Sequence, residues 1–215
     1  MKNKSFDRNE HVYRNNAFAE LVKDAIRFFN GTPVHGLPLS DRFMGTGVYA
    51  MYYTGENTHY TQLAALNRLS YAMPIYVGKA VPRGWRRARI SDNAKSQSYE
   101  LHSRIREHTR NIELVEGLAI QDFACRFVIF EEGGSDMIST VEAALIKLSR
   151  PLWNTTVDGF GNHTPGAGRF EQAKSDWDVI HEGREFAARC KGIPNDISHI
   201  QKNIASHFKA KKVLL

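Results

Sequence analysis

The chain of 215 residues is predicted to fold as one α+β domain, in which helices flank a small antiparallel sheet of about three strands and continue into N- and C-terminal extensions. Short runs rich in aromatic and β-branched residues predict the strands. These runs and the helical patterns follow the order strand, strand, helix, strand, helix, which indicates an α+β arrangement. The length suits a single domain, and neither an internal repeat nor a linker divides the chain.

The first predicted element is an amphipathic helix over residues 17–29, where apolar side chains recur every three or four positions. Asn15 or Asn16 can cap its start, because a side-chain oxygen there accepts a hydrogen bond from an unpaired backbone N–H. Residues 32–45, with two prolines and two glycines, then predict a loop.

Two strands and an insertion follow this loop. Residues 46–55 predict the first strand and residues 74–80 predict the second. The insertion, taken as residues 50–75, carries leucines at helical spacing, and the sequence does not indicate its role. Residues 80–97 are rich in arginine and predict a basic loop.

The second half of the domain is predicted to hold one more strand and several helices. We expect a helix over residues 98–112 and a strand over residues 122–130. Ser139 and Glu142 have the spacing of a capping box and predict the start of another helix. Glycine-rich residues 159–168 predict a loop. The C-terminal extension, residues 160–215, carries helical patterns around residues 170–190 and 197–209.

The composition is that of a globular protein. Apolar residues make up 42% and charged residues 24%, which excludes global disorder. Cys125 and Cys190 cannot build a disulfide framework, so a reducing compartment is favoured. Because the sequence shows no apolar run of membrane length and no signal-peptide pattern, we expect a cytoplasmic protein without a membrane partner.

The positive charge of the chain is concentrated in one segment. The net charge is +6, and residues 79–110 alone hold nine basic and three acidic residues. Such a local excess is typical of a surface that binds a polyanion, because neutralising phosphates dominates the affinity for nucleic acids. The alternative is a solvated loop that is simply rich in arginine.

Two matching tripeptides lie on the first two predicted strands, with the sequence GVY at residues 47–49 and YVG at residues 76–78. They resemble the GIY and YIG elements of the GIY-YIG nuclease family, each with valine in place of isoleucine. Taken alone, they could equally be two buried strand tyrosines.

The rest of the family pattern follows in order along the chain. Lys79 comes directly after the second tripeptide, and Arg104 and His108 share one face of a predicted helix. Glu142 is expected in the first turn of a later helix, and Asn154 ends a Pro-x-x-Asn run. This joint match identifies the chain as similar to GIY-YIG nucleases.

The resemblance covers residues 47–154, roughly half of the chain, and leaves residues 1–40 and 160–215 outside it. The gap between the tripeptides is longer than the family's usual hairpin. A histidine one turn after the arginine resembles the type II restriction endonuclease branch, and the long flanks suit a stand-alone enzyme. A repair or homing nuclease of the same family, or a non-catalytic DNA-binding protein with this fold, are the alternatives.

The resemblance implies a mechanism for phosphodiester hydrolysis. Tyr49 is expected to accept a proton from water, and it needs help because an ordinary tyrosine titrates near 10. His108 can relay that proton or orient the hydroxyl. Lys79 can share in activating Tyr49 or contact phosphate, and Tyr76 is expected to orient water or phosphate.

The remaining site residues concern metal and phosphate. Glu142 is expected to bind one Mg²⁺, which Mn²⁺ can replace, although it could be a capping residue instead. Arg104 is expected to bind the scissile phosphate and to stabilise the charge that develops on it. Asn154 is expected to orient a neighbour, or else to cap a loop.

The expected substrate is double-stranded DNA with a short palindromic site, which implies a homodimer because each chain supplies one active centre. A G·C-rich site is expected, since arginine pairs with guanine in the major groove. The other histidines show no ligand spacing and are expected to be surface or core residues. The residues expected to bind DNA are Arg83, Arg86, Arg87, Arg89, Lys95, Arg106 and Arg110.

Overall fold

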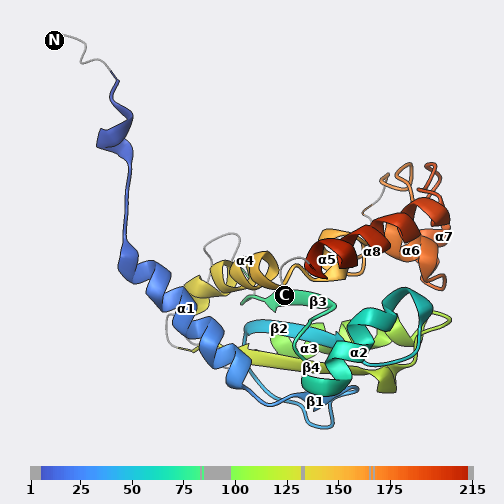
Figure 1. Ribbon diagram of the computed structural model, residues 1–215, viewed down its shortest axis with the longest axis horizontal. Helices are drawn as coiled ribbons and strands as arrows, with labels where there is room; N and C mark the ends of the chain where they lie inside the picture. Colours follow the sequence, from blue (N-terminus) through green and yellow to red (C-terminus); the bar gives the residue numbers. More distant parts are fainter. Residues whose placement is uncertain are drawn as a thin grey trace.

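The predicted α+β class is confirmed. A computed structural model places a four-stranded antiparallel sheet among helices (Figure 1). It describes residues 6–82, 84, 98–131, 134–164, 166 and 168–212. The strands lie in the order β1 (His35–Gly36), β4 (Phe123–Ile129), β2 (Gly47–Tyr53) and β3 (Tyr76–Ala80).

Strand β2 is the centre of the sheet, because it pairs with β4 on one side and with β3 on the other. All seven of its residues are buried. Side chains alternate between the two faces of a strand, so Tyr49, Met51 and Tyr53 join one hydrophobic cluster while Val48 and Ala50 join the other. The sheet is therefore covered on both faces.

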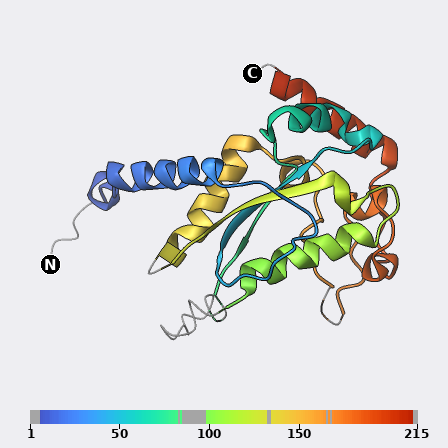
Figure 2. The ribbon, with the colours of Figure 1, turned by 90° about the horizontal axis from the view of Figure 1, so that it is seen from below.

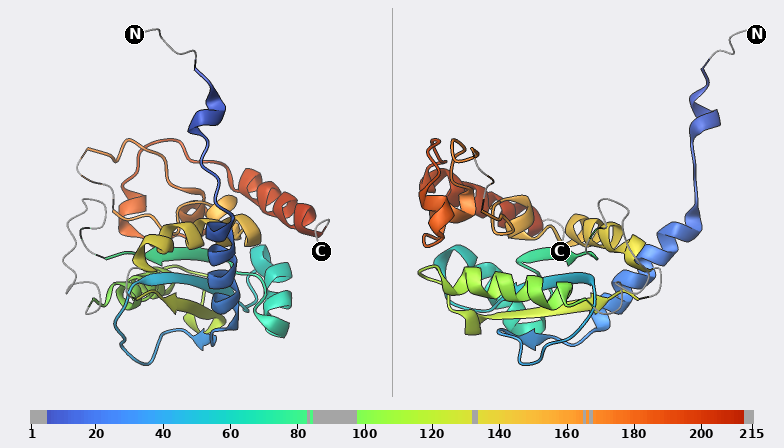
Figure 3. Two further views of the ribbon diagram at one scale, coloured as in Figure 1. Left: turned by 90° about the vertical axis from the view of Figure 1, so that its left-hand side faces the viewer. Right: turned by 180° about the vertical axis from the view of Figure 1, so that it is seen from behind.

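Helices α1 (Asn16–Gly31) and α4 (Ile138–Ser149) cover the Val48 face. Asn15 accepts a hydrogen bond from Ala17 N at the start of α1, which confirms the predicted cap. The segment before α1 projects away from the rest of the molecule (Figure 3).

Residues from α2 (Thr61–Ser70), α3 (Glu100–Glu113), α5 (Leu152–Thr155), α6 (Asp176–Ile180) and α8 (Ile197–Lys212) join the cluster that contains Tyr49. Figure 2 shows α3 beside the sheet, on the side away from α1. Among the described residues, the remaining short helices are α7 (Glu185–Ala188), η1 (Arg8–His11), η2 (Thr58–Tyr60), η5 (Ile120–Asp122) and η6 (Gly134–Met137).

The structure corrects the predicted start of α4. Helix α4 follows directly on η6, and Met137 stands at the N-cap position without a side-chain cap. The predicted capping box of Ser139 and Glu142 is therefore wrong, and Glu142 lies beyond the first turn. A 3₁₀ turn leading into a helix supplies backbone continuity there, so no side-chain cap is needed.

Two further boundaries differ from the prediction. The two-residue strand β1 lies in the segment predicted as a loop, because it is too short to produce an alternating pattern. The helical pattern at 170–190 is split into α6 and α7 by Gly183, which has a φ of +145° and lies where a side chain would collide with the Leu114 carbonyl.

Part of the insertion between the first two predicted strands belongs to the hydrophobic core. Its first residues complete β2, and the others form η2 and α2. Tyr60, Leu63 and Asn67 are buried, and the Asn67 amide bonds the backbone of Tyr53 and Met73. In the part of the chain that the structure describes, none of the helices has the length and apolarity to cross a bilayer.

Candidate active site

The two motif tyrosines come together because β2 and β3 are neighbours in the sheet. Tyr49 pairs with Gly78, and Met51 pairs with Tyr76. A Cβ atom on Gly78 would collide with the Tyr49 hydroxyl and would press on the Tyr76 ring. The glycine of the second tripeptide therefore makes the space in which the Tyr49 hydroxyl lies.

The Tyr49 hydroxyl lies 2.6 Å from Nε2 of His108, which α3 presents to the sheet. Both side chains are completely buried. The imidazole stacks on Phe160 at a centroid distance of 4.5 Å, and it meets the Tyr76 ring at 5.1 Å. The pair is thus fixed by rings on several sides.

Burial shifts the pKa values of these two groups in opposite directions. It raises the pKa of Tyr49 well above 10, and Tyr76 adds to the rise while Arg104 opposes it. It lowers the pKa of His108 well below 6.5, and the positive charge of Arg104 adds to that effect. At neutral pH the phenol is therefore protonated and the imidazole is neutral.

Arg104 is held by a network that sequence reasoning did not anticipate. Its guanidinium forms an ion pair with Glu107 at 2.6 Å and contacts Nε2 of His163 at 2.9 Å. It also donates to the carbonyl of Gly161 at 3.1 Å. His163 in turn lies 2.8 Å from Glu107, so it bridges the two charged groups. These contacts leave Arg104 close enough to Tyr49 and Tyr76 to lower the pKa of both.

The loop that supplies Gly161 and His163 is anchored by a buried ion pair in the C-terminal region. Arg184 and Asp178 lie 2.7 Å apart, and both are almost fully buried. Arg184 also donates to the carbonyls of Gly159 and Phe160. No local sequence signal marks Arg184, because its partners lie up to 25 residues away.

Lys79 and Glu142 lie together on the other side of β3, with Nζ and Oε2 2.6 Å apart. Side chains alternate along β3, so Lys79 shares the α4 face with Val77. The Glu142 carboxylate raises the pKa of both Tyr49 and Tyr76, which places it within electrostatic reach of the phenols. The structure thus brings Lys79 to Glu142, while His108 is the partner of Tyr49.

Asn154 contacts the backbone of the second tripeptide. Its side-chain oxygen accepts from Val77 N and its amide donates to Val77 O, both at 2.8 Å. Because Val77 lies between Tyr76 and Gly78, these two bonds fix the strand at the point where the motif residues project.

Among the described residues, no group of three or more histidine, cysteine, aspartate or glutamate side chains could hold a metal ion. One carboxylate still fits an ion such as Mg²⁺, which keeps several waters and takes other ligands from a bound phosphate. The partly exposed Glu142 carboxylate has that character, and its Lys79 partner occupies one of its two oxygens.

The residues expected to bind DNA divide into two groups. Arg106 and Arg110 are exposed on α3. Five others lie outside the described residues, namely Arg83, Arg86, Arg87, Arg89 and Lys95.

The site has the pattern of a GIY-YIG nuclease, with glycine-framed strand tyrosines, an arginine on the adjacent helix and a glutamate on a later one. The histidine on the adjacent helix resembles the type II restriction endonuclease branch. The family model described as the Eco29kI GIY-YIG domain matches residues 41–208. Because the match covers most of the chain, the chain belongs to this GIY-YIG family of type II restriction endonucleases. No curated protein matches the chain. The match includes the C-terminal region up to residue 208, which the motif resemblance left outside.

Proposed function

We propose that the protein is a type II restriction endonuclease that hydrolyses phosphodiester bonds in double-stranded DNA at a short palindromic site with Mg²⁺ as cofactor. The buried hydrogen bond between Tyr49 and His108, next to Arg104, carries this proposal. It joins a protonated phenol to a neutral imidazole, which is the pairing that a proton relay needs.

In the proposed mechanism, the Tyr49 oxygen takes a proton from the attacking water while its own proton passes to Nε2 of His108. Tyr49 cannot act as a phenolate at neutral pH, because its pKa is raised, so the relay depends on His108. For Nε2 to accept this proton, neutral His108 must carry its ring proton on Nδ1 before the reaction. The structure shows no hydrogen-bond partner for Nδ1 among the described residues. The imidazole becomes charged only during the reaction.

Arg104 is proposed to bind the scissile phosphate and to stabilise the negative charge that develops on it. Glu107, His163 and Gly161 support this role, because they restrict the guanidinium before DNA arrives. Such preorganisation lowers the cost of reaching the reactive geometry. Tyr76 is proposed to orient the water or the phosphate, and Asn154 to position Tyr76 through the strand backbone.

Glu142 is proposed to hold the Mg²⁺ ion, with Mn²⁺ as an alternative. When bound, such an ion polarises phosphate oxygens and stabilises the leaving oxygen. Lys79 is proposed to keep the Glu142 carboxylate in place and neutralised until DNA binds, or to contact phosphate afterwards. The ion pair of 2.6 Å between them supports the first of these roles.

We propose that the site is G·C-rich, because arginine pairs with guanine in the major groove. A palindromic site requires two active centres, so we propose a homodimer. The exposed apolar side chains of α1 support self-association, since Phe18, Leu21 and Phe28 are each about half exposed or more. Light scattering on the purified protein measures the mass of the particle and tests this part of the proposal.

The experiment that tests the function is plasmid cleavage with and without Mg²⁺. Discrete fragments that require Mg²⁺ are expected. Random or branch-specific cutting would instead indicate a repair or homing nuclease, and uncut plasmid would indicate a non-catalytic DNA-binding protein. Sequencing the ends of cut random DNA gives the recognition sequence.

A further inference from the structure

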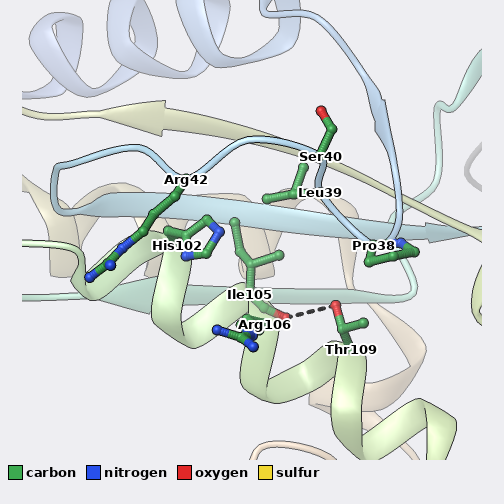
Figure 4. Close-up of a pocket in the computed structure, with 8 residues that line it drawn as sticks. All are labelled: Pro38, Leu39, Ser40, Arg42, His102, Ile105, Arg106 and Thr109. Carbon is green, nitrogen blue, oxygen red and sulfur yellow. Dashed lines mark hydrogen bonds between the residues drawn. The ribbon is translucent and has the colours of Figure 1, made fainter.

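A cavity with two arginines and a histidine in a partly apolar wall lies beside α3, away from the catalytic groups. It encloses about 310 Å³ between α3 and the loop that connects β1 to β2 (Figure 4). The basic and polar residues of its wall are Arg42 on the loop and His102, Arg106 and Thr109 on the helix, and the apolar part of the wall comes from Pro38, Leu39 and Ile105. His102 and Arg106 are each two residues from Arg104, so they lie roughly 200° around the helix from it. The cavity and Arg104 therefore occupy opposite flanks of one helix.

The walls of this cavity are held by specific contacts. The guanidinium of Arg42 lies over the Tyr99 ring, 3.6 Å from its centroid. The backbone around Gly45 bonds Ser98 and Leu101 at the start of α3, which ties the loop to the helix. Phe43 packs edge-on against His102 at 5.5 Å. Arg42 therefore lies on a loop that is fixed to the start of α3.

The charges around the cavity are unbalanced. Arg42 and Arg106 both lower the pKa of His102, after the larger effect of burial, so both guanidinium groups lie near the imidazole. Asp41, the neighbouring acid, accepts a hydrogen bond from Ser40. Within the described part of the chain, the structure shows no ion pair from Arg42 or Arg106 to a carboxylate. Two cations beside a neutral histidine favour an anionic ligand.

We propose that this cavity is a second phosphate-binding site, in which Arg42, Arg106 and His102 bind a backbone phosphate of the DNA duplex. The inference rests on the proposed function. The site lies on the helix that carries Arg104, within the most basic segment of the chain, so one duplex can contact both flanks of α3. A phosphate bound here carries no sequence information and fixes the position of the duplex on the enzyme.

The test compares the affinity for a duplex containing the cleavage site across a range of salt concentrations, measured in EDTA so that DNA is not cut. The double variant Arg42→Gln/Arg106→Gln is expected to bind about tenfold more weakly and to lose roughly one unit of the slope of log affinity against log salt. Arg27→Gln is the matched control, because Arg27 is an exposed arginine on α1, over the other face of the sheet. It is expected to bind as the wild type does.

Wild-type affinity and salt slope in the double variant would overturn the inference, even if inorganic phosphate shifted the His102 resonances in an NMR titration. Unchanged DNA affinity together with a phosphate-induced shift of His102 would indicate a site for a free anion. If the wild type itself neither binds nor cuts DNA, the proposed function fails instead.

Discussion

Two buried tyrosine–histidine pairs lie in this molecule, and they have nearly the same local geometry. The hydroxyl of Tyr49 is 2.6 Å from Nε2 of His108, and that of Tyr60 is 2.5 Å from Nε2 of His181. In both pairs burial raises the pKa of the phenol and lowers the pKa of the imidazole. In the described structure, Nδ1 of each histidine has no hydrogen-bond partner.

The surroundings of the two pairs differ. Tyr60 accepts a hydrogen bond from the indole of Trp153, so its hydroxyl is engaged on both sides. Tyr49 lies within electrostatic reach of Arg104 and Glu142. The arginine near the second pair, Arg184, acts on His181 and is itself paired with Asp178. The comparison teaches that a short tyrosine–histidine hydrogen bond is not a catalytic signature by itself. We propose chemistry for the first pair because Arg104 and Glu142, the proposed ligands of phosphate and metal, lie within electrostatic reach of Tyr49.

The largest loss of cleavage is expected from a substitution near the first pair that leaves Tyr49 and His108 themselves unchanged. Glu142→Gln should abolish cleavage while DNA binding stays nearly intact, because it removes the charged metal ligand and little DNA contact. Glu113→Gln, at the end of α3, is the matched control and should cleave normally. Cleavage by Glu142→Gln near the wild-type rate in Mg²⁺ would show that this carboxylate does not hold the metal.

The next prediction compares the cleavage rates of variants at the two tyrosines. Tyr49→Phe should lower the single-turnover cleavage rate by about 10²–10⁴-fold, the usual contribution of a positioned general base. Tyr60→Phe removes the same hydroxyl from the other pair and should leave the rate within about twofold. Equal rate losses in the two variants would remove the distinction between the pairs.

The same two variants should rank in the opposite order for stability. Tyr60→Phe leaves both the Trp153 indole and His181 without their partner, so it should lower the free energy of unfolding by about 1–3 kcal/mol. Tyr49→Phe leaves His108 without its partner, but Arg104, which also contacts the Tyr49 hydroxyl, keeps Glu107, His163 and Gly161, so this variant should cost less. Urea denaturation of both variants gives the comparison, and a larger loss in Tyr49→Phe would contradict it.

A gradual effect, common to both pairs, is expected in acid. His108 and His181 are neutral when folded, with the pKa of His181 lowered to about 3, so the unfolded chain binds more protons below about pH 6.5. Stability should therefore fall as the pH drops below about 6.5, and the contribution of His181 should persist toward pH 3. His181→Gln should flatten this dependence, as thermal unfolding at several pH values can show. A stability that is constant down to pH 4 would contradict neutral burial.

The parts of the fold that the sequence predicted correctly are those set by local patterns. The helix capped by Asn15 and the three longer strands follow from periodicity and capping, which act over a few residues. Strand β1 and the start of α4 could not be predicted, because pairing with a distant strand and a preceding 3₁₀ turn decide them.

The candidate site shows the same division. The tripeptides and the i, i+4 spacing of Arg104 and His108 indicate which side chains meet, and the structure brings them together. The contact of His163 with Arg104 spans 59 residues, so no spacing rule could reveal it. Strand alternation turns Lys79 toward Glu142, and its contact with phosphate stays a prediction.

A single-turnover pH–rate series on the wild type, Tyr49→Phe and His108→Ala tests the central claim most directly. If neutral His108 relays the proton, the wild-type rate should fall in acid, at a pH well below the 6.5 of an exposed histidine, because burial lowers the pKa of His108. His108→Ala should lose that acidic limb together with most of the rate, while circular dichroism confirms that it is folded at each pH. A His108→Ala enzyme that keeps both the limb and the rate, or a Tyr49→Phe enzyme with full activity, would contradict the account.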